Sequence, residues 1–234
     1  MKETSGSGKP RFSEEMIQDC LSIMKSGSVE DLFEIIPRIG VLRDKRFHRP
    51  LLELLRGKDA RRREFAAYAM GAMGDREFLE PLKEVFLETC VRREGGPQAL
   101  QVAVIEAIGA LGDDAAAEFF LPVLTGDQVG RDRIRLCKCI LDSLGAIAQQ
   151  GGPRSLEVLV KLTRHRNAEI RAHSLSELAV AYWHRPNEIS DDTLNRIIEL
   201  VHDRSSIVAE SALAALQSLA DVGCTRAEKF FAAD

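Results

Sequence analysis

The sequence predicts an all-α fold, and three observations lead to that prediction. Ala, Leu, Ile, Glu and Arg dominate the composition while only 6% of residues are aromatic, a balance that favours helices over sheet. Apolar residues recur with helical spacing along most of the chain. A short pattern of an apolar residue, a glycine and a second apolar residue also returns, in places degenerate, every 31 to 38 residues. The same composition argues against an all-β fold.

Each copy of this pattern marks the first of two helices in a repeating unit. Four copies keep the glycine, in segments 39–44, 70–75, 108–113 and 144–149, and degenerate copies begin at Leu178 and Leu216. About eleven residues after each glycine a second apolar stripe predicts a second helix. In the third copy we expect Ile108 and Leu111 of the first segment and Phe120 and Leu124 of the second to be buried between neighbouring repeats. A helix pair of this length cannot bury its own apolar stripes, so consecutive pairs must stack on one shared core.

Residues with capping chemistry separate the expected helices. Ser28 followed by Asp31 has the pattern of a capping box, and Asn167 has the side chain of an N-cap. Gly74 and Gly112 are suited to end helices, because glycine readily adopts the left-handed conformation found there. Residues that are suited to start or end helices therefore recur at regular intervals along the chain.

The signature in segments 70–75 and 108–113, followed by a leucine-rich second helix, resembles HEAT repeats, in particular the short bacterial HEAT-like type. This resemblance implies an α-solenoid, an armadillo-type right-handed superhelix of about six HEAT-like helix pairs. We expect residues 1–12 to be a disordered leader and residues 13–234 to be a single repeat domain. The expected repeats lie near 28–58, 59–94, 97–127, 130–165, 167–203 and 205–234, after an added helix over 13–25.

Charge and composition narrow the class of protein. The 32 basic residues against 36 acidic ones give a net charge of −4, so no net positive field attracts a polyanion and we do not expect nucleic acid as a partner. The N-terminus lacks the apolar core of a secretory signal, and no segment has the roughly 20 apolar residues that span a bilayer. Cys137 and Cys139 lie in a helical stretch and are expected to be reduced thiols. We therefore expect a cytoplasmic protein without a membrane partner, and its oligomeric state stays open.

Three enzyme classes built from HEAT-like repeats were considered. The di-iron hydroxylases of this fold present His-Glu dipeptides from several repeats, and none of the five histidines here precedes a glutamate. The alkylpurine DNA glycosylases use aromatic side chains near the lesion; Trp183 beside His184 could stack on a base, although packing of Trp183 against the next repeat is the simpler interpretation. Bilin lyases share the repeat type, but no group of residues here specifies a bilin. A glycosylase-like and a bilin-lyase-like protein remain the alternatives.

No residues with catalytic or metal-ligand spacing are evident. Cys137 and Cys139 are two positions apart, which separates their side chains by roughly 200° around a helix axis and makes them unsuited to one metal ion. We therefore predict no catalytic, cofactor-binding or metal-binding residue, no cofactor, and no enzymatic activity.

The second helices carry the expected binding surface. In HEAT-like arrays these helices line the concave face, and we expect a non-catalytic interaction or scaffold module that binds a protein or peptide there. Mixed charge around a few apolar positions is what such a groove requires, because apolar contacts supply affinity and rim charges steer the encounter. The candidate contacts are the apolar residues Leu87, Leu121 and Val158 and the charged residues Glu80, Glu84, Arg154 and Lys161.

Overall fold

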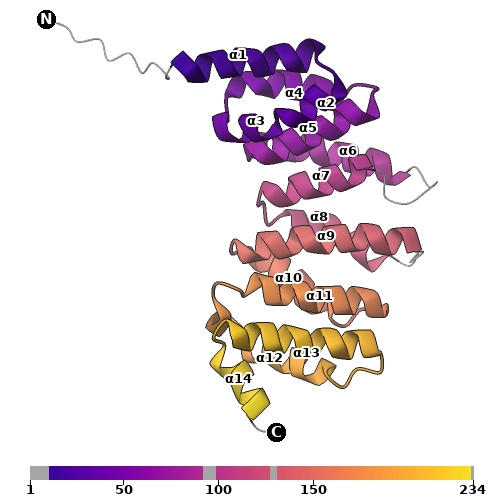
Figure 1. Ribbon diagram of the computed structural model, residues 1–234. Coiled ribbons are helices and arrows are strands. Elements are labelled where there is room, and N and C mark those ends of the chain that lie inside the picture. The colour runs from indigo at the N-terminus through magenta and orange to yellow at the C-terminus, as the bar shows by residue number, and fades with distance from the viewer. Residues whose placement is uncertain (1–10, 92–98, 127–130, 233–234) are drawn as a thin grey trace, which may run out of the picture.

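The computed structural model describes residues 11–91, 99–126 and 131–232. Within these ranges the chain is all-helical, with fourteen α-helices, three short 3-10 helices and no strand. The prediction of an all-α fold is therefore confirmed. Figure 1 shows the helices one below another, from α1 at the top to α14 at the bottom, with the two termini at opposite ends.

The helices follow one another with short connections. The N-terminal half contains α1 (Arg11–Ser26), α2 (Val29–Glu34), α3 (Ile36–Leu42), η1 (Lys45–Phe47), α4 (His48–Leu55), α5 (Ala60–Met73), η2 (Arg76–Phe78), α6 (Leu79–Val91) and α7 (Ala99–Ala110). The remainder contains α8 (Ala116–Thr125), α9 (Arg131–Gln149), α10 (Pro153–Leu162), α11 (Ala168–Ala181), η3 (Pro186–Glu188), α12 (Asp191–Leu200), α13 (Ser206–Asp221) and α14 (Thr225–Ala232).

These helices form two layers that differ in how closely they pack. The first-helix layer consists of α3, α5, α7, α9, α11 and α13, and each of these helices packs directly on the next. The second-helix layer consists of α4, α6, α8, α10, α12 and α14, in which α8 and α10 are the most closely packed neighbours. Contact between successive repeats therefore runs mainly through the first-helix layer.

The first glycine of the repeated pattern explains this close packing. A Cβ atom added to Gly71 would lie 2.9 Å from the Cα of Ala107, and one added to Gly109 would lie 2.8 Å from the Cβ of Ser143. Both distances are shorter than carbon atoms tolerate. Glycine at these positions therefore allows adjacent first helices to approach along their length.

The second glycine of the pattern ends the first helix. Gly74 and Gly112 have φ angles of +69° and +66°, in the left-handed region that glycine adopts without steric cost. Asp75 then caps η2 by accepting a hydrogen bond of 3.1 Å from the backbone of Glu77. In the first repeat Arg43 occupies the glycine position and has a φ of +43°.

The other expected caps are present, with one difference in the first repeat. Ser28 and Asp31 form a complete capping box, and the Asn167 side chain accepts hydrogen bonds from two backbone amides of α11. The first helix of the first repeat is divided at Ile35, because Pro37 lies in the first turn of α3 and lacks the N–H group that a continuous helix needs.

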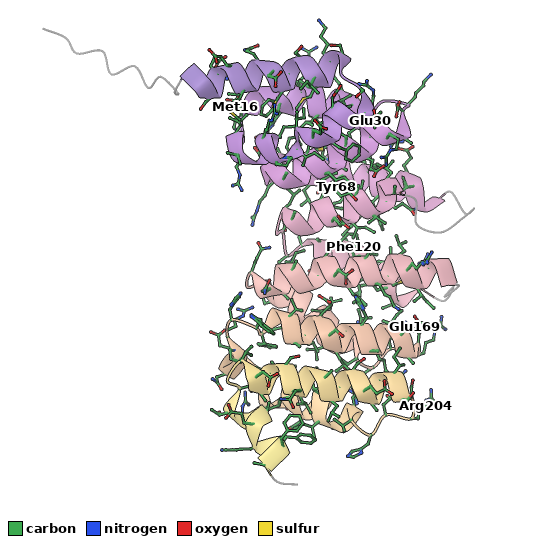
Figure 2. The ribbon with its side chains drawn as sticks, viewed as in Figure 1. Met16, Glu30, Tyr68, Phe120, Glu169 and Arg204 are labelled. Carbon is green, nitrogen blue, oxygen red and sulfur yellow. The ribbon has the colours of Figure 1, made fainter. Side chains whose placement is uncertain are left out.

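The core runs between the two layers through the whole stack. Ile108, Leu111, Phe120 and Leu124 are buried, as the helical spacing predicts. The rings of Phe86 and Phe120 meet edge to face with their centroids 5.3 Å apart, and Figure 2 shows Phe120 in the middle of the stack. Side chains from neighbouring repeats therefore share one core.

The N-terminal region differs slightly from expectation. Residues 1–10 of the predicted leader 1–12 lie outside the described residues, and the last two belong to α1. None of the described helices has by itself the length and apolar character needed to cross a membrane; α13 and α14 meet that test only as a pair, and they are bent by 119° relative to each other.

Candidate functional site

Helix α6 carries three of the residues predicted to contact a partner. Glu80, Glu84 and Leu87 are all exposed, and Leu87 has 55% of its surface open to solvent. Leu82 and Phe86 point the opposite face of the helix into the core and are fully buried. This amphipathic division leaves Leu87 as a large apolar side chain on an otherwise charged surface.

The predicted contacts on α8 and α10 fit less well. Leu121 is half-buried and packs against the core, while Arg154 and Lys161 are exposed. The prediction that Val158 lies outside the core is wrong, since only 7% of its surface is exposed. The reason is that α10 packs against both α9 and α11, which enclose the side of the helix that carries Val158.

Arg154 also serves the joint between two repeats. Its guanidinium lies 3.1 Å from Glu118 on α8, and its backbone amide donates to Asp114 at 2.8 Å, as does that of Ser155. Burial opposes ionisation of Asp114, but these two hydrogen bonds outweigh it and lower the pKa of the carboxyl. The charge of Arg154 is therefore partly balanced by Glu118 and is less available to a binding partner.

A cavity of about 510 Å³ lies where α4, α5 and α6 meet. Its charged lining consists of Arg56, Lys58, Arg63, Glu84 and Glu88. Arg63 forms an ion pair of 2.6 Å with Glu88, whereas Arg56 and Lys58 are exposed and form no ion pair with any described residue. The cavity thus places two available cations beside the predicted contact Glu84.

A second cavity, of about 480 Å³, shares Arg56 and extends toward the start of α4. His48 lies on its wall with Nε2 3.1 Å from Asp75 and Nδ1 3.2 Å from Glu77. The imidazole therefore connects α4 to η2 of the next repeat. Together the two cavities make a groove along the second-helix layer, and Arg56 lies at its centre.

The first-helix layer holds another group of the same residue types. Asp142 on α9 meets His173 and Glu177 on α11, with the His173 Nε2 atom 2.5 Å from Asp142 and 3.8 Å from Glu177. Burial, with a smaller contribution from Asp142, raises the pKa of Glu177 to about 7 against the attraction of His173. We refer to Asp142, His173 and Glu177 as the α9–α11 cluster.

Sequence reasoning missed both groups, and the reason is their separation along the chain. Asp142 precedes His173 by 31 residues, about one repeat, so only stacking of the repeats brings them together. The available signal was the spacing of His173 and Glu177, which are four residues apart and so share a helix face. The prediction that no metal-ligand arrangement exists considered motifs along the chain, whereas two groups of His, Asp and Glu with ligand atoms within 4.8 Å of one another form across repeats.

Two other predictions concern single side chains. Cys137 is buried, and burial raises the pKa of its thiol to about 11; the described cysteines are free. The interpretation that Trp183 packs against the next repeat is wrong, because 49% of its surface is exposed while the preceding Tyr182 is buried. Tyr182 takes the core position at the end of α11.

Comparisons with known proteins found likeness only among solved structures. No family model matches the chain, and no curated protein matches it. An engineered protein is similar over 88% of this chain and 97% of its own, at 20% identity and a TM-score of 0.43. Human deoxyhypusine hydroxylase in complex with glycerol is similar over 92% of this chain and 86% of its own, at 16% identity and a TM-score of 0.41.

The second likeness corrects one expectation. Deoxyhypusine hydroxylase is an enzyme and an all-helical protein of HEAT-repeat type, so the prediction that this chain is not an enzyme is wrong as a conclusion from its repeats. At a TM-score of 0.41 the likeness transfers no activity to this chain. The all-helical character of the described residues rests on the structure itself.

Proposed function

We propose that this chain is a HEAT-like α-solenoid that binds a protein or peptide along its second-helix layer, centred on α6. The observation that carries the proposal is the exposure of Leu87, 55% open to solvent, beside a groove with charges of both signs. An exposed apolar side chain with a charged surround has the composition of a binding surface, in which the apolar part supplies affinity.

The charges around Leu87 indicate the kind of segment that would bind. Arg56 and Lys58 are available cations at one side, and Glu80 and Glu84 are exposed acids along α6. Glu80 lies 2.9 Å from Lys83, so part of its charge is balanced locally. A partner segment with an apolar residue between an acidic and a basic stretch would complement this surface.

The proposed binding surface is defined by its residues and does not depend on which helix layer is concave. The HEAT resemblance assigns second helices to the concave face of a superhelix. The closer packing of the first helices favours the opposite curvature, since the inner layer of a curved stack has the shorter spacing. The surface around Leu87 is exposed in either case.

Site-specific photo-crosslinking in the native cell tests the proposal. A photoreactive residue is placed at Leu87 in one variant and, as a matched control, at Leu213, which is 45% exposed on α13 of the first-helix layer. We expect a discrete crosslinked protein from position 87 and none from position 213. A crosslink from position 213 alone would place the partner on the other layer and overturn the proposal.

The partner recovered in this way allows a kinetic test. Glu84→Lys should mainly slow association, because exposed charge governs the encounter, and Leu87→Asp should mainly speed dissociation, because a buried apolar contact governs residence. Leu121→Asp should act like Leu87→Asp, with a smaller effect on binding because Leu121 is half-buried before the partner arrives. Unchanged rate constants in the Glu84 and Leu87 variants would contradict the proposed surface.

A further inference from the structure

Three donor atoms converge on one point between α9 and α11. The Nε2 atom of His173 faces Asp142 at 2.5 Å and Glu177 at 3.8 Å, and all three donor atoms lie within 4.8 Å of one another. A tetrahedral ion with bonds of about 2.1 Å holds its ligands about 3.4 Å apart. The observed distances bracket that value, so displacements of about 1 Å or less would complete the site.

These donor atoms have no other structural role in the part of the chain that the structure describes. Among the described residues, Asp142 and Glu177 accept no hydrogen bond from a backbone amide, and the ring of His173 contacts these two carboxylates, with Asp142 as its hydrogen-bond partner. Glu177 is nonetheless partly buried, with 13% of its side chain exposed. A carboxylate in such a position ordinarily has hydrogen-bond donors or a cation as partners.

The backbone of α9 makes room for the Glu177 carboxylate. A Cβ atom at Gly145 would overlap Oε2 of Glu177. At Gly71 and Gly109 the equivalent space is taken by the neighbouring helix, through Ala107 and Ser143. At the fourth copy of the repeated glycine, Gly145, the space is therefore taken by the Glu177 carboxylate and not by a neighbouring helix.

The local charge is also unbalanced. Glu106 on α7 is close enough to Asp142 for the two carboxylates to repel each other, and Asp142 repels Glu177 in turn. Among the described residues, His173 attracts the Glu177 carboxylate, and no lysine or arginine side chain contributes to that attraction. Another ion pair joins the same two helices, between Lys138 and Glu169 at 2.7 Å. A bound cation would offset this negative charge.

The group formed by His48, Asp75 and Glu77 provides a contrast. There the two carboxylates approach different nitrogens of the ring, at 3.1 and 3.2 Å. Asp75 is also engaged in capping η2. Because a metal ion binds one imidazole nitrogen and Asp75 is committed to its cap, this group is less suited to an ion than the α9–α11 cluster, although its ligand atoms also lie within 4.8 Å of one another and His48 Nε2 is buried without a hydrogen bond.

We propose that Asp142, His173 and Glu177 bind one divalent transition-metal ion of the Zn²⁺ class. One imidazole nitrogen and two carboxylate oxygens are ligands that such ions prefer, whereas Mg²⁺ and Ca²⁺ favour sites made of oxygen alone. Three protein ligands leave at least one coordination position for water or another small ligand. The site joins the fourth repeat to the fifth through the first-helix layer.

Isothermal titration of the chelator-treated full chain with Zn²⁺ tests this assignment. We expect one ion per chain. His173→Ala, Glu177→Gln and Asp142→Asn should each weaken binding by about tenfold or more, since each removes a direct ligand. Asp142→Asn is the safest variant for folding, because its side chain is 58% exposed and the substitution keeps its shape.

Two further variants and a folding check make the result decisive. His48→Ala should leave Zn²⁺ affinity unchanged, and Gly145→Ala should weaken it by displacing the Glu177 carboxylate. Circular dichroism of each metal-free variant shows whether the helices are intact. Absence of stoichiometric binding, or a loss of affinity in His48→Ala with none in Asp142→Asn, would overturn the assignment.

Discussion

The two helix layers of this protein differ in how closely their helices pack. In the first-helix layer, glycine at positions such as Gly71 and Gly109 brings neighbouring helices into contact. In the second-helix layer the helices are further apart, and cavities of about 510 and 480 Å³ lie beside α4 and α6. The first-helix layer therefore makes most of the contact between repeats, and the second-helix layer, although Phe86 meets Phe120 and Arg154 meets Glu118 within it, keeps more surface for a partner.

Charged side chains follow the same division. In the first-helix layer, Arg171 on α11 reaches Asp203 in the turn before α13, with 7% and 11% of the two side chains exposed. In the second-helix layer, Arg49 and Glu53 pair within a single helix, with 90% and 65% exposed. Removing one partner of a buried ion pair is strongly destabilising, because it leaves the other charge buried and unpaired, whereas removing one partner of an exposed pair costs little. The comparison predicts that substitutions in the two layers have very different consequences.

The largest expected effect follows from removing the buried cation. Arg171→Ala removes the partner of Asp203 at 2.8 Å and the hydrogen bonds that Arg171 donates to the carbonyl groups of His165 and Arg166. We expect the free energy of unfolding to fall by about 3 to 5 kcal/mol. Chemical denaturation measures it, and Arg49→Ala is the control from the second-helix layer, for which we expect no measurable loss. Equal losses in both variants would contradict the division between layers.

The same ion pair predicts a pH dependence. The hydrogen bond from Arg171, opposed by burial, holds the pKa of Asp203 below its ordinary value of 3.8. A depressed carboxyl pKa stabilises the folded state above its ordinary value, and this stabilisation is lost as the pH falls through the folded-state pKa. The stability difference between wild type and Asp203→Asn should therefore be constant above about pH 5 and shrink below pH 4. A difference that grows on acidification would be inconsistent with this pair.

Removal of a core side chain should have the next largest effect. Ile108 is fully buried on α7, between two neighbouring first helices. Ile108→Ala should destabilise the fold by roughly 2 to 5 kcal/mol, because it removes apolar contacts and leaves a cavity. Leu87→Ala on α6 is the matched control and should cost much less, since Leu87 is half-exposed. A larger drop in melting temperature for Leu87→Ala than for Ile108→Ala would contradict this order.

Adding a single carbon between first helices should have a smaller effect. In Gly71→Ala the new Cβ would lie 2.9 Å from a backbone atom of Ala107, which cannot rotate away. We expect a loss of about 1 to 3 kcal/mol from overpacking. Glu157→Ala, at an exposed position of α10, should change stability by no more than about 0.5 kcal/mol. Tolerance of alanine at position 71 would mean that glycine there does not set the spacing.

The smallest effect is a gain in stability. Arg43 ends α3 with a φ of +43°, where the next two repeats have Gly74 and Gly112. Arg43→Gly relieves the steric cost of the left-handed conformation but increases the freedom of the unfolded chain. We expect a net stabilisation on the order of 0.5 kcal/mol. A decrease in melting temperature would show that the hydrogen bond from the Arg43 side chain to the carbonyl of Gly40, 3.1 Å long, contributes more than the strain.

The local features of this fold were predictable from the sequence. Helical periodicity identified the buried residues Ile108 and Phe120, and capping chemistry identified the helix starts at Ser28 and Asn167. These predictions succeeded because they depend on residues within a few positions of each other. The role of Gly71 was harder to assign, since its contact with Ala107 lies in the next repeat.

The candidate sites were predictable only in part, for the same reason. Leu87 was assigned correctly to an exposed face because α6 has neighbours on one side, whereas Val158 was misplaced because its exposure depends on how α9 and α11 enclose α10. The α9–α11 cluster could not be read from any motif, because Asp142 and His173 meet only when the repeats stack. Contacts across repeats are therefore the part of the structure that motifs in a single sequence do not predict.

Hydrogen exchange with and without the partner recovered by crosslinking tests most directly the claim that the two layers have separate roles. On binding, we predict slower exchange for the amides of α6 and for those lining the groove at the end of α4. The amides of α9 and α11, which hold the stack together, should exchange at the same rate in both states. Protection of α9 and α11 with none in α6 would contradict the account, because it would place the partner on the first-helix layer.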